Sequence, residues 1–167
     1  IEKKSKEIYK KNNLKNKYFN YVSKSENKFF KGNNFYKKNS FLMSILWGEI
    51  NKVEKISLVN FLKSDLYIIF GASYIKGWLA KFLIKKKAIN IHMGISPYYR
   101  GSACNFWAVF DGNPHLVGAT IHYLGKGIDS GEILFHALPS KKYNNYFDLT
   151  MGSVLSAQKG LILKIQN

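Results

Sequence analysis

The sequence is poor in proline and cysteine and has no long uncharged apolar run. Among its 167 residues there are three prolines and one cysteine, Cys104. A lone cysteine cannot form an internal disulfide, which excludes a disulfide-stabilised secreted scaffold and favours a reducing, cytoplasmic setting. No uncharged apolar run reaches the roughly 20 residues that a membrane-spanning helix needs, and no targeting peptide is recognisable. We therefore expect a cytoplasmic protein with no membrane partner and one main globular core.

Arginine and acidic residues are also scarce, whereas lysine is abundant. The chain has 26 basic residues against 10 Asp and Glu, a formal net charge of +16, and Arg100 is its only arginine. A basic surface attracts phosphate, but specific phosphate and base recognition tends to use guanidinium groups. The joint abundance of Lys, Asn, Ile, Phe and Tyr is also what an A+T-rich coding sequence produces. The charge therefore has two explanations, a functional basic surface and a coding bias.

The positive charge is concentrated at the amino end of the chain. Residues 1–38 contain twelve Lys and three Glu, with few aliphatic residues. This composition is typical of a solvated helix or a connecting segment. We therefore divide the chain into a Lys-rich segment at 1–40, which is a helix or a connecting region, and a folded domain at 41–167.

Apolar runs of strand length alternate with segments of helical length from residue 41 onward. The expected strands lie at 41–47, 66–70, 88–93, 117–124 and 133–138. The expected helices lie at about 53–63, 77–84, 104–111 and 147–165. This alternation predicts an α/β domain with a mostly parallel, Rossmann-like sheet in three layers.

Two polar residues interrupt the third apolar run, in the stretch NIHMGISPYYRG at 90–101. Strand alternation places Asn90 and His92 on one face, near the strand end where open α/β sheets bind ligands. A polar pair in a buried strand needs partners, so a hydrogen-bonded core pair is one explanation. The other is a functional site, which is favoured by the Gly-, Pro- and Tyr-containing loop that follows.

A second polar cluster lies downstream, in the stretch GATIHYLGKGIDSGEIL at 118–134. Alternation places Thr120 and His122 on one face, and the Gly-rich turn presents Asp129. Seen alone, Asp129 is explained as a turn-former and His122 as a core histidine. An Asp, an Asn and two His at adjacent strand ends together favour a catalytic site.

These two segments resemble the catalytic domain of the 10-formyltetrahydrofolate-dependent formyltransferases, which include the methionyl-tRNA, glycinamide ribonucleotide and nucleotide-linked amino-sugar formyltransferases. The family pattern is Asn-x-His, a Pro-containing loop ending in Gly, and a downstream Asp-x-Gly. Here Asn90 precedes Asp129 by 39 positions. The resemblance covers about residues 41–165 and implies the formyltransferase fold. It also implies a first strand and helix that this chain lacks, so we expect an amino-terminally truncated chain.

The resemblance implies catalytic roles for Asn90, His92 and Asp129 in moving a formyl group from 10-formyltetrahydrofolate to a primary amine. The attacking amine makes the formyl oxygen negative, and an amide hydrogen of Asn90 would stabilise that charge. Asp129, directly or through a water, would move the proton from the amine to the folate nitrogen. His92 would share one of these tasks, and His122 would support Asp129.

Further residues are implied around this centre. The folate pterin is expected against Ser73, Tyr74, Ile75, Gly127 and Ile128. The acceptor is expected at Ser96, Tyr98 and Arg100. The Ser-Pro-Tyr-Tyr-Arg-Gly form of the loop favours a nucleotide-linked amino sugar as the small-molecule acceptor. The alternatives are glycinamide ribonucleotide, methionyl-tRNA, which alone would bring a nucleic-acid partner, or a non-catalytic folate- or nucleic-acid-binding domain.

Metal and thiol chemistry are not expected. The four histidines lack the close paired spacing of a zinc site, and the reaction of the resembled family needs no metal. Cys104 has no catalytic partner in the sequence, so we do not expect a cysteine nucleophile. The sequence gives no expectation for the oligomeric state.

Overall fold

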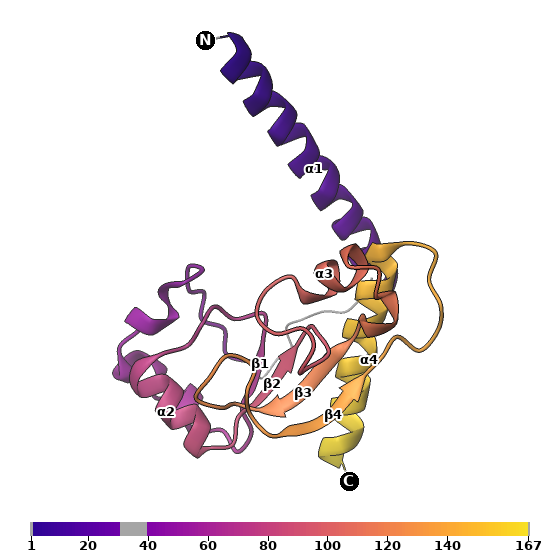
Figure 1. The fold of residues 1–167 in the computed structure, drawn as a ribbon. Helices are drawn as coiled ribbons and strands as arrows, with labels where there is room; N and C mark the ends of the chain where they lie inside the picture. Colours follow the sequence, from indigo (N-terminus) through magenta and orange to yellow (C-terminus); the bar gives the residue numbers. More distant parts are fainter. Residues whose placement is uncertain (1, 31–39, 167) are drawn as a thin grey trace.

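The structure, a computed structural model, describes residues 2–30 and 40–166. Its centre is a four-stranded sheet in the order β1-β2-β3-β4 (Figure 1). The strands are β1 (Ile68–Phe70), β2 (Ile89–His92), β3 (Ala119–Tyr123) and β4 (Ile133–Ala137). β1 is parallel to β2, whereas β3 is antiparallel to both β2 and β4.

The predicted α/β class is confirmed, but the expected mostly parallel pairing holds only for β1 and β2. The connection from β3 to β4 is a short Gly-rich segment, long enough for a hairpin and too short for a crossover helix. The connection from β2 to β3 contains a helix, yet β3 returns antiparallel to β2. A helix between two strands is therefore not sufficient evidence for parallel pairing in this chain.

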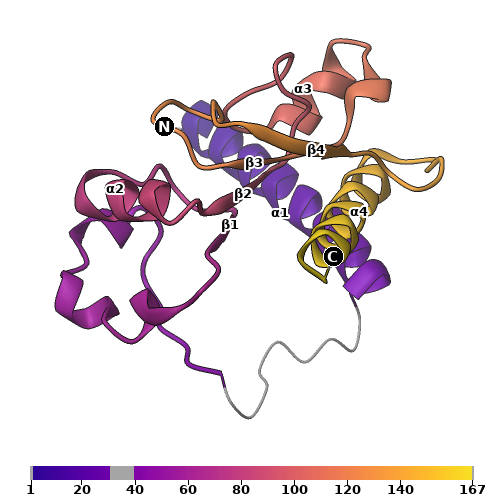
Figure 2. The ribbon, with the colours of Figure 1, turned by 90° about the horizontal axis from the view of Figure 1, so that it is seen from below.

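Helices cover the sheet on both faces (Figure 2). They are α2 (Gly77–Lys85), α3 (Cys104–Phe110) and α4 (Tyr146–Gln166). Figure 2 shows α4 on one face of the sheet and α3 on the other. Ala157 and Leu161 of α4 pack against the apolar side chains of β2 and β3, including Ile91 and Ile121. The opposite face of the same two strands is left for polar side chains.

A second apolar cluster lies beside β1. Leu79 and Leu83 of α2 pack there with Leu58 and Ala88. Short 3₁₀ helices complete this part of the domain, at η1 (Glu49–Lys52), η2 (Lys55–Leu58) and η3 (Phe61–Lys63), and a fourth, η4 (Pro114–Leu116), precedes β3.

Two expected elements are corrected by the structure. The prediction of a strand at 41–47 is wrong: this segment has no strand partner and leaves Phe41 83% exposed and Trp47 78% exposed. The prediction of one helix at 53–63 is also wrong, because η2 and η3 replace it. The β-branched residues Val53, Ile56 and Val59 lower the α-helical propensity of that stretch.

The Lys-rich segment contains the helix α1 (Glu2–Phe30). The carboxyl-terminal part of α1 packs on the start of α4, and the rest projects away from the domain (Figure 1). The part of the expected segment at 31–39 lies outside the described residues. Within the described part of the chain, no helix has both the length and the apolarity needed to cross a bilayer.

Candidate active site

The pairing of β2 with β3 brings the predicted polar residues together. Asn90 lies opposite His122, and His92 lies opposite Thr120. All four side chains share the face that α4 does not cover, because their apolar neighbours in each strand point toward α4. His92, His122 and Thr120 are buried, and Asn90 is partly buried.

Asp129 enters this cluster from the turn between β3 and β4. Its Oδ1 accepts a hydrogen bond from Asn90 Nδ2 at 3.2 Å, and its Oδ2 accepts one from the Gly101 N–H at 2.8 Å. The side chain is only 12% exposed. Asp129 has a φ of 45°, in the left-handed region that non-glycine residues seldom adopt. The turn therefore holds an unfavourable backbone conformation that directs this carboxylate at the two strands.

Gly131 fixes the path of the same turn. A Cβ atom at this position would collide with the carbonyl oxygen of Tyr123. The close approach of the two backbone segments, rather than a positive φ, is what requires glycine here. The Asp-x-Gly spacing thus has a steric cause in this chain.

Both ring nitrogens of His92 face acceptor oxygens. Nε2 lies 2.9 Å from the carbonyl oxygen of Tyr99, and Nδ1 lies 3.2 Å from Asp129 Oδ2. An imidazole that carries hydrogens on both nitrogens satisfies both contacts. His92 is therefore held between the loop that follows β2 and the carboxylate.

His122 has one donor and one acceptor contact. Its Nδ1 lies 2.7 Å from the carbonyl oxygen of Tyr123, which requires Nδ1–H to donate. Nε2 of the neutral ring then accepts from Asn90 Nδ2 at 3.1 Å. The distance from Nε2 to Asp129 Oδ1, 3.7 Å, is too long for a hydrogen bond. The two amide hydrogens of Asn90 are thus used by His122 and Asp129.

The carboxyl of Asp129 is held in its charged form. Burial alone would raise its pKa, but the hydrogen bond from the Gly101 N–H and the positive charge of a protonated His92 hold the pKa below its usual value. Because a carboxylate accepts hydrogen bonds without donating any, this charged form suits the contacts that converge on it. It also suits a group that takes up a proton during a reaction.

The loop at 94–101 carries two of the backbone contacts to the site and is itself anchored to β3. Thr120 Oγ1 accepts a hydrogen bond from the Ser96 N–H at 2.9 Å and donates one to the Gly94 carbonyl at 2.6 Å. His136 Nε2 lies 3.0 Å from the Ser96 carbonyl. A Cβ at Gly94 would lie 2.6 Å from both His92 Nε2 and the Cβ of Cys104, so only glycine fits there.

Thr120, Tyr99 and Gly101 are therefore parts of the site that the sequence prediction did not include. Strand alternation could have identified Thr120, since it shares the strand face of His122. The Tyr99 carbonyl and the Gly101 N–H are backbone groups, and no residue type marks such a group in a sequence.

A family model described as formyl transferase matches residues 51–142, which is just over half of the chain. The chain belongs to the formyl transferase family. The matched residues include β2, the loop at 94–101, β3 and the turn that carries Asp129.

Curated relatives of this formyl transferase chain are methionyl-tRNA formyltransferases. The protein of Desulforamulus reducens is 41% identical over 49 residues, which are 29% of this chain and 15% of that protein. The protein of Prochlorococcus marinus is 29% identical over 82 residues, which are 49% of this chain and 25% of that protein. The chain thus spans a quarter or less of the length of these two relatives.

Solved structures show a similar fold. A 4-N formyltransferase from Francisella tularensis is 26% identical with a TM-score of 0.54, over 68% of this chain and 47% of that chain. The formyltransferase PseJ from Anoxybacillus kamchatkensis is 21% identical with a TM-score of 0.51, over 83% of this chain and 68% of that chain. The PseJ structure is a complex with tetrahydrofolate and UDP-4,6-dideoxy-4-formamido-L-AltNAc.

The residues predicted to hold the folate lie in two separate loops. Ser73, Tyr74 and Ile75 follow β1, where the Tyr74 carbonyl accepts a hydrogen bond from Asn51 Nδ2 at 2.8 Å. Ile75 packs in the apolar cluster with α2. In the turn before Asp129, the Gly127 N–H donates to Ser130 Oγ at 3.0 Å and Ile128 is exposed. A pterin contact at these loops stays a prediction.

The residues predicted to hold the acceptor differ in accessibility. Tyr98 is 70% exposed and Arg100 is exposed, so both side chains can meet a ligand. Ser96 is 1% exposed, and its backbone contacts Thr120 and His136. The expected acceptor contact at Ser96 does not fit this placement, because its side chain does not reach solvent.

Cys104 begins α3 next to the site and is buried. Burial and the nearby charge of Asp129 raise the pKa of its thiol to about 11. A thiol is nucleophilic only as the thiolate, so this environment opposes nucleophilic catalysis. Among the side chains that the structure describes, no group of three or more His, Cys, Asp or Glu is placed to hold a metal ion.

Proposed function

We propose that this domain transfers a formyl group from 10-formyltetrahydrofolate to a primary amine of an acceptor. The convergence of Asn90, His92, His122 and Asp129 on one face of β2 and β3 is the observation that carries the proposal. The formyl transferase model covers all four residues, so the family match and the polar cluster coincide in the chain.

Asp129 supplies the proton transfers of the proposed reaction, and His92 supports it. The amine nitrogen bonds to the formyl carbon and loses a proton, and the bond from that carbon to the folate nitrogen then breaks as the nitrogen gains one. Asp129, charged and hydrogen-bonded to the Gly101 N–H, is the base that receives the proton from the amine, directly or through a water, and the protonated carboxyl then gives that proton to the folate nitrogen. His92, in contact with the same carboxylate, steadies the charge that develops.

Asn90 supplies a hydrogen-bond donor for the oxygen that becomes negative. Its two amide hydrogens are used by His122 and Asp129, so one of them must leave its partner when substrate arrives. Protonation of Asp129 weakens its hold on the amide at the stage when the oxygen carries charge. Such a donor is worth about 100-fold to 1000-fold in rate.

We propose a nucleotide-linked amino sugar as the acceptor. The exposed Tyr98 and Arg100 lie in the loop that also holds Asp129 through Gly101, and an aromatic ring beside a guanidinium suits a sugar or base joined to phosphate. The PseJ structure contains a nucleotide-linked formamido sugar, which supports this class of acceptor.

A charged initiator tRNA is the second candidate. The matched curated relatives in Desulforamulus and Prochlorococcus are methionyl-tRNA formyltransferases, and the net charge of +16 suits a polyanionic acceptor. Glycinamide ribonucleotide is the third acceptor to include in a test.

The test is acceptor-dependent release of tetrahydrofolate by the full chain, with the three acceptors in parallel. Asn90→Ala and Asp129→Ala should each lower the rate about 100-fold or more. The exposed residues Asn60 and Asp65 lie outside the cluster, so Asn60→Ala and Asp65→Ala are matched controls that should keep the rate. A folded chain that binds the folate yet turns over none of the acceptors would support the non-catalytic alternative instead.

A further inference from the structure

A band of aromatic side chains runs from α3 across the start of α4 to α1. Ring centroids lie 6.0 Å apart for Phe110 and Phe106, 6.3 Å for Phe106 and Tyr146, and 5.4 Å for Tyr146 and Phe147. The Phe147 ring stacks on Tyr21 of α1 at 5.3 Å and 16°. Six rings of this aromatic band are exposed: Tyr18, Phe19, Tyr21, Phe106, Trp107 and Phe110. An exposed apolar patch that joins three helices is unusual for a surface without a partner.

The part of α1 that lies beside this band carries positive charge. Residues 13–30 contain four Lys and one Glu, an excess of three positive charges. Lys17 and Lys24 are exposed and lie seven positions apart, so they share a flank of the helix with Tyr21. Among the described side chains neither lysine forms an ion pair, whereas Lys28 is paired with Asp148 at 2.6 Å. Lys17 and Lys24 are therefore available to an anionic partner.

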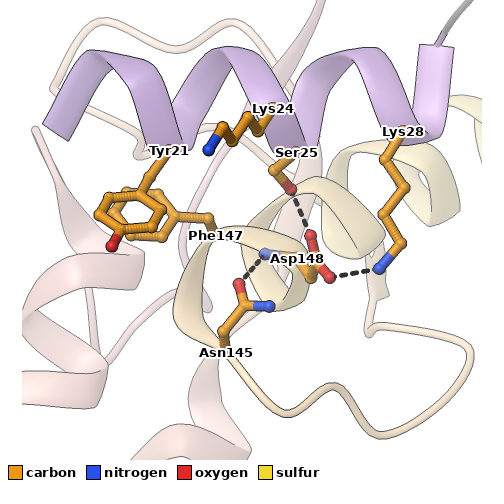
Figure 3. Close-up of a pocket in the computed structure, with 7 residues that line it drawn as sticks. All are labelled: Tyr21, Lys24, Ser25, Lys28, Asn145, Phe147 and Asp148. Carbon is orange, nitrogen blue, oxygen red and sulfur yellow. Dashed lines mark hydrogen bonds and ion pairs between the residues drawn. The ribbon is translucent and has the colours of Figure 1, made fainter. Parts of the chain in front are cut away.

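A cavity opens where the band meets α1 (Figure 3). Its volume is about 320 Å³, near the lower end of the range for small-ligand pockets. Figure 3 shows the Lys24 side chain extending toward the stacked rings of Tyr21 and Phe147. On the other side of the cavity the Asp148 carboxylate accepts hydrogen bonds from Ser25 Oγ, at 2.7 Å, and from Lys28 Nζ. The cavity thus offers an aromatic wall beside an unpaired ammonium group.

We propose that this aromatic and lysine face binds a single strand of nucleic acid. Unstacked bases pack on exposed aromatic rings whatever their sequence, and lysines along the same surface follow the phosphates. A duplex keeps its bases stacked inside and cannot use the rings. The proposal goes beyond the proposed formyl transfer, because it uses none of the four residues of the candidate active site.

Two other occupants fit the face less well. A helix that lies on a membrane needs a continuous apolar face, but α1 has only three aliphatic residues in 29, namely Ile8, Leu14 and Val22. A second copy of the chain would bring two α1 helices together, each with the same excess of positive charge, and like charges repel. Charge and exposed rings together favour nucleic acid.

The test is the affinity of the full chain for a fluorescent oligouridylate of about 12 nucleotides, measured by anisotropy from about 50 to 200 mM salt. Lys17→Gln with Lys24→Gln should weaken binding about 10-fold and lower the slope of log affinity against log salt concentration by about 1.4, about 0.7 for each lost contact to a single-strand phosphate. Phe110→Ala should weaken binding about 5-fold or more through lost stacking. An oligothymidylate of the same length should bind in the same way.

Matched controls lie on other surfaces. Lys81→Gln with Lys85→Gln removes the same charge from exposed positions of α2, and Phe41→Ala removes an exposed ring outside the aromatic band. Both should leave the affinity unchanged, as should Asp129→Ala, which separates this proposal from formyl transfer. Equal losses in the controls, equal affinity for a duplex of the same length, or tighter binding to anionic lipid vesicles would each overturn it.

Discussion

Asn90 and Asp129 lie 39 positions apart in the sequence, yet the Asn90 amide donates to the Asp129 carboxylate at 3.2 Å. The contact joins a buried strand to a turn that holds Asp129 in the left-handed region, which few non-glycine residues adopt. The amide is also the group that links His122 to the carboxylate. The four polar side chains therefore form one connected network rather than two separate pairs.

Asn90→Asp should make the stability of the domain fall as the pH rises. The substitution places a second carboxyl beside Asp129, and two carboxyls that share a site cannot both ionise easily, so one pKa is raised. An acid whose folded-state pKa is raised destabilises the protein above its unfolded pKa, so the loss should grow from about pH 4 to pH 7. Urea unfolding across this range measures the effect.

The double variant Asn90→Asp with Asp129→Asn is the control for that experiment. It restores one carboxyl and one amide to the pair, and it should recover most of the stability at pH 7. Equal, pH-independent losses in the single and double variants would show that the two side chains are not coupled.

Thr120→Val should lower kcat about 10-fold to 100-fold with little change in KM. Valine has the shape of threonine but can neither accept from the Ser96 N–H nor donate to the Gly94 carbonyl. The loop at 94–101 would then lose its hydrogen bonds to β3 and shift His92, and small misplacements of reacting groups cost about this much in rate. Steady-state kinetics of formyl transfer gives the two constants.

Thr120→Ser is the matched control, because it keeps the hydroxyl and removes only a methyl group. It should retain a kcat close to that of the wild type. If serine and valine were equally slow, the packing of the methyl group rather than the two hydrogen bonds would position the loop.

Cys104 should be unreactive in the folded protein. With a pKa raised to about 11, roughly one thiol in a thousand is ionised at pH 8, and the side chain is buried. A thiol reagent should therefore react only as fast as the protein unfolds, and the rate should rise to that of a free thiol in denaturant. Rapid labelling of the native chain at pH 8 would contradict this prediction.

Most of the sheet could be predicted from the sequence because its core strands and helices have clear apolar periods. β2, β3, β4, α2 and α4 lie within a few residues of the expected ranges. The direction of β3 could not be predicted, since a helix-containing connection is compatible with either direction. The prediction of a strand at 41–47 failed for a different reason: the segment is apolar, but no neighbouring strand pairs with it.

The candidate site was likewise predictable only in part from the sequence. Strand alternation predicts that Asn90 and His92 share a face, and that His122 shares one with Thr120, but only the register of β2 and β3 sets them opposite each other. The Tyr99 carbonyl and the Gly101 N–H depend on the path of the backbone. The roles assigned to these residues stay predictions until activity is measured.

The contact of Asp148 with α1 should make the docking of that helix depend on pH. Hydrogen bonds from Lys28 and Ser25 lower the pKa of Asp148, although burial opposes them. A carboxyl with a lowered folded-state pKa contributes stability that is fully present above its unfolded pKa of about 3.9 and is lost as the pH falls through the lower folded value. Asp148→Asn should thus cost about 1 kcal/mol at pH 7 and almost nothing near pH 2. Urea unfolding at both pH values checks this, with Asp65→Asn at an exposed position as the control, and a cost that persists unchanged at low pH would contradict the role of the charge.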